Sequence, residues 1–160
     1  MSAPAGLVLR PQRASDEDFL KALFASTREH LLAALPPDAQ LRATFIDLQF
    51  KAQCQAYHRD CAGAVPEIIE IDGTAVGRWI VDRSGETVRL VDLSLMPPHR
   101  GRGIGGALLR GLLAEAAASG RRVSLSVAVD NPAQRLYARL GFQTVARDGL
   151  YLRQENGAGP

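Results

Sequence analysis

The chain has 160 residues, of which 46% are hydrophobic and 22% charged, and its formal net charge is +2. This length suits one domain with its own core, and the small, dispersed charge argues against a nucleic-acid-binding protein. No apolar stretch approaches the ~18 residues of a membrane span, the N-terminus lacks a secretory pattern, and two cysteines make no disulfide framework. We therefore expect a cytoplasmic protein that binds no membrane.

The first half of the chain predicts a short strand, two helices and three consecutive strands. Ser15 fits the N-cap of the first helix, whose opening turn is acidic and whose apolar residues recur at helical spacing. Pro36-Pro37 separates the helices, and Asp72-Gly73 is a hairpin signal. The expected elements are a strand at Leu7–Arg10, helices at Asp16–Thr27 and Leu41–Asp60, and strands at Glu67–Asp72, Ala75–Asp82 and Thr87–Met96.

The second half alternates helices with strands. Pro97-Pro98 ends a strand, Asn131-Pro132 opens a helix, and Gly141 stops that helix near Leu140. The crossover that leaves Thr87–Met96 through a helix is expected to be parallel and right-handed. The remaining expected elements are a helix at Gly103–Ser119, a strand at Val123–Val129, the helix opened by Asn131-Pro132, and strands at Phe142–Ala146 and Leu150–Arg153.

This element order predicts a single α/β domain over residues 7–154, with an antiparallel meander in its middle. Residues 1–6 and 155–160 are small, polar or rich in glycine and proline, so we expect both ends of the chain to be flexible.

The segment Arg100–Gly106 lies between a strand and a helix and contains four glycines. Free N–H groups at the start of a helix form an anion site, and glycines let phosphate oxygens approach the backbone. Arg100 and Arg102 can add charge-assisted hydrogen bonds. The segment therefore predicts a pyrophosphate site, and the alternative is a flexible loop whose glycines only permit a tight turn.

The same glycines, at positions 101, 103 and 106, also match the dinucleotide fingerprint, with Asp130 at the end of the next strand. In that fold the strand runs nearly straight into the first glycine, whereas Pro97–Arg100 intervenes here. Too few residues follow Asp130 for the further βα units that a nicotinamide-dependent oxidoreductase needs. No Gly-Lys-Ser/Thr follows the glycines, which excludes a P-loop, and no G-x-S-x-G marks a hydrolase.

Two stretches resemble the signatures of the GNAT acetyltransferase superfamily. Arg100-x-x-Gly103-x-Gly105 is similar to its pyrophosphate motif, Gln/Arg-x-x-Gly-x-Gly/Ala, and Asn131–Phe142 is similar to its second signature. The match is close from about Val88 to Val145 and extends to the earlier residues in element order only. The resemblance implies a GNAT-like mixed sheet with a splayed parallel strand pair and helices on both faces.

The resemblance also implies acetyl-CoA as co-substrate, with its pantetheine arm between the splayed strands. The backbone of Leu95 and Met96 would pair with the pantetheine amides, as an added strand does. Asn131 would hydrogen-bond pantetheine, and the residues alone equally support an N-cap for the helix at Pro132. The pyrophosphate would be held by Arg100 and by the segment Gly101, Arg102, Gly103, Ile104, Gly105 and Gly106.

The activity implied is direct acetyl transfer to a primary amine, without a covalent enzyme intermediate. Tyr137 stands at the family's usual general-acid position, where its phenol would protonate the leaving thiolate, although the residue also fits a core tyrosine. Asp92 is the one carboxylate on the strand that enters the motif, so it is the candidate base, directly or through water. It also fits a strand residue that faces solvent. Some family members carry a glutamate where Arg89 stands here.

Cys54, His58 and Cys61 would share one helix face and form a partial metal site. A structural zinc site needs four ligands, so we expect no metal and assign the cysteines to the core. The same region mixes aromatic and polar side chains, as the wall of an acceptor pocket does. The candidates for that wall are Phe45, Leu48, Phe50, Ala52, Tyr57 and His58.

The expected partner is a small-molecule or peptide amine. The resemblance to the family does not indicate which amine it is. Family members are often dimers, which makes a homodimer one expectation. The competing function from another class is a catalytically inactive module that senses acyl-CoA.

Overall fold

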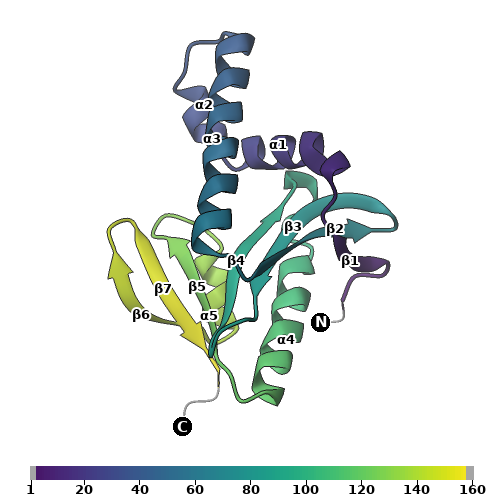
Figure 1. Cartoon of the computed structure of the whole chain (residues 1–160), viewed down its shortest axis with the longest axis vertical. Coiled ribbons are helices and arrows are strands. Elements are labelled where there is room, and N and C mark those ends of the chain that lie inside the picture. The colour runs from purple at the N-terminus through teal and green to yellow at the C-terminus, as the bar shows by residue number, and fades with distance from the viewer. Residues whose placement is uncertain (1–2, 158–160) are drawn as a thin grey trace.

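The computed structural model describes residues 3–157 and shows an α/β fold around one seven-stranded mixed sheet (Figure 1). Expectations for residues 1–2 and 158–160 lie outside the described part. The strand order is β1-β2-β3-β4-β5-β7-β6, and β4 and β5 form the parallel pair. The strands are β1 (Leu7–Pro11), β2 (Ala64–Ile71), β3 (Thr74–Asp82), β4 (Val88–Leu95), β5 (Val123–Ala128), β6 (Gln143–Asp148) and β7 (Tyr151–Asn156).

Helices cover both faces of the sheet, as the resemblance implied. Among the described residues, no helix is both long and apolar enough to cross a membrane. The α-helices are α1 (Glu17–Ser26), α2 (Glu29–Ala33), α3 (Ala39–Asp60), α4 (Ile104–Ala118) and α5 (Gln134–Arg139), and the 3-10 turns are η1 (Ala14–Asp16) and η2 (Pro97–His99).

Two hydrophobic cores lie on opposite faces of the sheet. The α4-side core packs α4 and α5 against the central strands, with Leu109 and Val123 fully buried. The α3-side core packs α1 and α3 against β2, and the rings of Phe24 and Phe50 meet edge to face at 5.8 Å between centroids. Burial of these apolar side chains stabilises the helices on the sheet. The far end of α3, with α2 beside it, extends beyond the sheet (Figure 1).

The first helix begins later than the sequence predicts, at Glu17. Ser15 lies inside η1 and does not cap α1. The carboxylate of Asp16 accepts hydrogen bonds from the Arg13 amide at 2.7 Å and from the Arg10 guanidinium at 2.7 and 2.9 Å. These contacts tie the entry of the helix to β1, so the first turn adopts 3-10 geometry.

Other element boundaries also differ from the expectation. The third helix begins at Ala39 because the Asp38 carboxylate caps it, accepting from two amides of its first turn. The short helix α2 was not expected from the sequence. The last strand continues to Asn156, beyond the expected Arg153, because it pairs with β5 as far as Val123.

Strand β4 contains a β-bulge at Val91. Leu90 pairs with Val81 and Asp92 pairs with Ile80, which leaves Val91 without a partner on β3. One extra residue reverses the faces of the side chains that follow it. Val88 and Leu90 therefore face the α4-side core, whereas Asp92 faces α3.

The parallel pairing of β4 with β5 is short and ends just before this bulge. It runs from Val88 with Val123 to Leu90 with Leu125, after which the strands separate. Figure 1 shows the two strands diverging towards the side where α3 approaches the sheet. The sequence-based expectation of a splayed parallel pair is confirmed.

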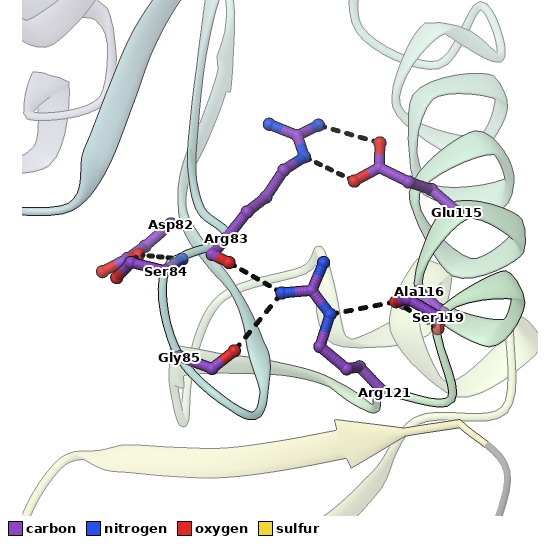
Figure 2. Close-up of polar contacts among 8 residues, drawn as sticks. All are labelled: Asp82, Arg83, Ser84, Gly85, Glu115, Ala116, Ser119 and Arg121. Atoms are coloured by element: carbon purple, nitrogen blue, oxygen red, sulfur yellow. Dashed lines mark hydrogen bonds and ion pairs between the residues drawn. The ribbon is translucent and has the colours of Figure 1, made fainter.

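Arg121 stabilises the end of the β4–β5 pair at which the two strands are hydrogen-bonded. Its Nη1 donates to the carbonyl of Arg83 at 2.7 Å and to that of Gly85 at 3.3 Å (Figure 2). Its Nε donates to Ser119 Oγ at 2.9 Å, and Arg83 itself forms an ion pair with Glu115 of α4. The turn between β3 and β4 is thereby tied to the end of α4, just before β5 begins.

We predict that Arg121→Ala lowers the free energy of unfolding by about 1–2 kcal/mol, because two turn carbonyls lose a charged donor. Chemical denaturation measures this change. Arg59→Ala is the matched control, since that arginine makes only an exposed ion pair with Asp60 and its loss should leave stability unchanged. Equal stability of the Arg121 variant and the wild type would show that these contacts do not hold the turn.

Candidate active site

A pocket of about 240 Å³ lies where β4 and β5 separate. Its wall combines main chain of the two strands with side chains from α3, α5 and the segment between α1 and α2. The lining residues are Arg28, Gln53, Tyr57, Leu90, Val91, Asp92, Leu93, Leu125, Ser126, Val127, Ala128, Asn131, Tyr137 and Tyr151. The structure thus brings together four residues that the sequence singled out, namely Tyr57, Asp92, Asn131 and Tyr137.

Tyr137 reaches the pocket from α5 and is 7% exposed. Its ring packs edge to face against Phe142 at 5.7 Å between centroids. Burial raises the pKa of Tyr137 to about 12, and the negative charge of Asp92 acts in the same direction. The phenol therefore keeps its proton at neutral pH, as a proton donor must.

Asp92 faces the pocket from β4 and takes part in an ion pair. Its Oδ2 accepts from Arg78 Nε at 2.7 Å, and its Oδ1 accepts from Ser94 Oγ at 2.8 Å. Arg78 is 5% exposed and also donates to Gln53 Oε1 of α3 at 2.8 Å. Asp92 is therefore not a strand residue that faces open solvent, because the bulge and Arg78 fix its carboxylate at the gap.

Helix α3 supplies the aromatic side of the same wall. The Arg78 guanidinium lies 5.6 Å from the ring centroid of Tyr57, whose pKa burial and Asp92 raise above the usual range. Tyr57 is the one residue of the six wall candidates that lines the pocket. Phe45 and Phe50 instead join the α3-side core. The other three lie on the surface, and they are Leu48, Ala52 and His58.

Three lining or supporting residues were missed by the sequence reasoning, namely Arg28, Gln53 and Arg78. Arg78 left a signal, because a charged residue inside the apolar run of β3 is buried only when it is paired. The bulge also left a signal. The apolar residues of β4 alternate up to Leu90 and then resume at the very next position, Val91. Such a shift by one position is expected where a bulge adds a residue to a strand.

The glycine-rich turn ends in a helix start that no side chain caps. Gly103 is the N-cap of α4 with φ +83°, and Gly101 has φ +72°, both in the left-handed region that favours glycine. A Cβ on Gly105 would lie 3.3 Å from Leu136 of α5. Gly105 and Gly106 are both buried, so these two glycines let α4 pack closely rather than opening the turn to a ligand.

Arg100 does not point its guanidinium into the turn. Its Nε donates to the carbonyl of Leu95 at 2.9 Å, and its Nη2 donates to Ser26 Oγ at 3.2 Å. The Arg100 side chain therefore links the turn to the end of β4 and to α1, and its role at a phosphate stays a prediction. Arg102 is exposed beside the turn.

The backbone of Leu95 and the backbone of Met96 face in different directions. The Met96 amide donates to the Val76 carbonyl at 2.8 Å, and its carbonyl accepts from the His99 amide at 2.9 Å. Both main-chain groups of Met96 are thus used within the fold, and a pairing of Met96 with a ligand stays a prediction. Leu95 is the preceding residue of the same antiparallel ladder, so its N–H points away from β3 towards the gap, while its carbonyl accepts from Arg100 Nε.

Asn131 lies on the pocket wall, but it is not the N-cap that the sequence predicts, because α5 begins at Gln134 and Ala133 is its N-cap. In the turn that leads into the helix, Asn131 Oδ1 accepts from the Ala133 amide at 2.9 Å, and the main-chain amide of Asn131 donates to the Ala128 carbonyl at 3.0 Å. This turn leaves the side-chain NH₂ group of Asn131 as a donor at the gap.

The partial metal pattern in α3 does not form one helix face. Helix α3 ends at Asp60, and Cys61 follows it as the C-cap with φ −133°. Cys61 is buried, whereas Cys54 and His58 are exposed. Within residues 3–157, no group of three or more histidine, cysteine, aspartate or glutamate residues is placed to hold a metal ion.

Solved acetyltransferases share this fold. The chain aligns with the PaiA N-acetyltransferase from Thermoplasma acidophilum in complex with coenzyme A, with a TM-score of 0.70 and 16% identity, covering 95% of this chain and 99% of that one. An acetyltransferase from Thermus thermophilus gives a TM-score of 0.66 at 19% identity, covering 98% and 99%. The spermidine N-acetyltransferase from Vibrio cholerae in complex with CoA and spermine gives 0.60 at 17%, covering 94% and 93%.

Sequence comparison supplies the family directly. No curated protein matches the chain. The model of the Acetyltransferase (GNAT) family matches residues 24–142, which is well over half of the chain and includes both signatures found in the sequence. The chain therefore belongs to the GNAT acetyltransferase family.

Proposed function

We propose that this protein is an acetyl-CoA-dependent N-acetyltransferase that passes the acetyl group directly to an amine. The observation that carries the proposal is the meeting of Tyr137 and Asp92 in one pocket at the strand gap. A buried phenol that keeps its proton stands in the same pocket as a fixed carboxylate. Family membership supports acyl transfer, and this pair of groups supports proton transfer to and from the reacting atoms.

The donor site fits a pyrophosphate followed by an amide-bearing arm. The uncapped N-terminus of α4 presents main-chain N–H groups and a positive dipole end, and the left-handed Gly101 leaves open space beside it. Arg102 adds a positive charge. The main-chain N–H of Leu95 and the side-chain amide of Asn131 suit hydrogen bonds to a pantetheine arm in the gap. Acetyl-CoA would supply the activated thioester.

The proposed chemistry needs two proton transfers. The amine nitrogen forms a bond with the thioester carbon, and the carbon–sulfur bond breaks. Tyr137 donates its proton to the departing sulfur, and the amine loses a proton to Asp92 directly or through water. Tyr137 regains a proton from solvent, and Asp92 releases its proton to solvent. Holding thioester and amine in one pocket supplies much of the acceleration.

Thiol release measured with acetyl-CoA and a mixed panel of primary amines tests this function. We expect free CoA to appear only when an acceptor amine is present. The alternative function, an inactive acyl-CoA sensor, is favoured if CoA binds but no amine is acetylated. Failure to bind CoA would contradict both functions.

We predict that Gly101→Ala weakens CoA binding about tenfold, because the added Cβ projects into the open space beside the helix start. Isothermal titration calorimetry with CoA measures the affinity. Gly120→Ala is the matched control, since Gly120 has φ +69° and similarly open surroundings at the other end of α4. Both variants should lose about 1–2 kcal/mol of stability through backbone strain. Equal CoA affinity of the two variants would contradict a pyrophosphate site at Gly101.

We predict that Tyr137→Phe lowers kcat by about 100-fold or more while the affinity for CoA is retained. Phenylalanine keeps the packing against Phe142 but has no proton to donate. Steady-state rates and CoA titration measure the two quantities. Turnover by the variant equal to that of the wild type would remove the role of the phenol.

The raised pKa of Tyr137 also predicts the alkaline behaviour of kcat. A group that acts in its protonated form loses activity as pH rises through its pKa, here about 12 instead of the usual value near 10. The kcat profile should therefore show no decline centred near pH 10. A decline centred there that is absent in Tyr137→Phe would show that the phenol titrates as if exposed.

A further inference from the structure

The pocket wall carries two charged side chains, and only one of them is compensated. Asp92 is neutralised by the buried Arg78 at 2.7 Å. Arg28 is the other charged lining residue, and it forms no ion pair with any residue between positions 3 and 157. The wall therefore presents one net positive charge to whatever enters the pocket.

Arg28 is held in place without using most of its donors. Its guanidinium lies over the Phe24 ring at 4.7 Å from the centroid, and one nitrogen donates to Thr27 Oγ1 at 3.3 Å. A guanidinium has five N–H donors in a planar fork that matches a carboxylate. The stacked, half-buried group thus has donors available for a carboxylate, and the positive charge of Arg28 also acts on the pocket phenol Tyr57.

We propose that the acceptor is a free amino acid, whose carboxylate binds Arg28 while its amine faces Asp92 and Tyr137. This inference rests on the proposed function and names its substrate class. A carboxylate supplies the negative charge that the wall lacks, and it leaves the amine as the reacting end. A polyamine would instead bring several positive charges to a wall whose one carboxylate is already paired with Arg78.

The test compares molecules that differ only in this charge. Initial rates with acetyl-CoA are measured for the standard L-amino acids, for the α-carboxamide of each, and for spermidine. We expect at least one amino acid to have a kcat/KM about tenfold or more above those of its own carboxamide and of spermidine.

Variants at Arg28 assign the discrimination to this side chain. In Arg28→Gln the ratio of kcat/KM between the amino acid and its carboxamide should fall to about one, mainly through KM for the acid. Arg28→Lys should keep part of the ratio because it keeps the charge. Arg59→Gln is the control, since Arg59 is exposed and paired outside the pocket, and it should leave the ratio unchanged.

The outcomes separate the two proposals. Turnover of carboxamides or spermidine as fast as that of amino acids overturns the acceptor class but leaves acetyl transfer standing. An unchanged ratio in Arg28→Gln overturns the assignment to Arg28. If CoA binds but no acceptor of any class is acetylated, the proposed function itself fails, and the acceptor class fails with it.

Discussion

The unpaired Val91 in β4 determines where the chemistry of this protein can occur. The bulge ends the parallel pairing with β5 at Leu90 and turns Asp92 from the α4-side core to the face that α3 covers. A regular strand would have buried this carboxylate among apolar side chains, at a large desolvation cost. Because Arg121 fastens the other end of the strand pair, the strands separate on the side where Tyr137 stands.

The ion pair between Arg78 and Asp92 contributes more to the position of the carboxylate than to the stability of the fold. Removing two charges from water costs about as much as their attraction returns, so such a pair adds little to folding. Here it fixes a carboxylate at the edge of the gap, and the bond from Arg78 to Gln53 ties the guanidinium of the pair to α3. The same negative charge helps to keep the Tyr137 phenol protonated. The ion pair between Arg78 and Asp92 therefore connects α3 with the surroundings of Tyr137, the proposed acid.

The sequence predicted those parts of the site that depend on local order along the chain. The turns at Arg100–Gly106 and at Asn131-Pro132 follow from short segments with strong backbone requirements, whereas the splayed strand pair follows from the resemblance to the GNAT family. The use of the Met96 N–H within the fold could not be predicted, because its direction depends on pairing with β3, which the residue itself does not reveal. The bulge at Val91 could have been found, since the apolar phase of β4 changes there. Arg28 could not, because only the folded chain brings it to a pocket built largely from later residues.

The proposed donor site was easier to predict from the sequence than the proposed acceptor site, because the two depend on different kinds of groups. The proposed donor site uses main-chain groups and an uncapped helix end, which lie between Leu95 and Asn131. The proposed acceptor site adds side chains from the earlier part of the chain, through α3 and the junction of α1 and α2. A change at Arg28 alters the charge that an acceptor meets but leaves the helix start at Gly103 untouched. Under these proposals, acceptor choice can vary on this scaffold while the donor site is retained, because the two depend on different parts of the chain.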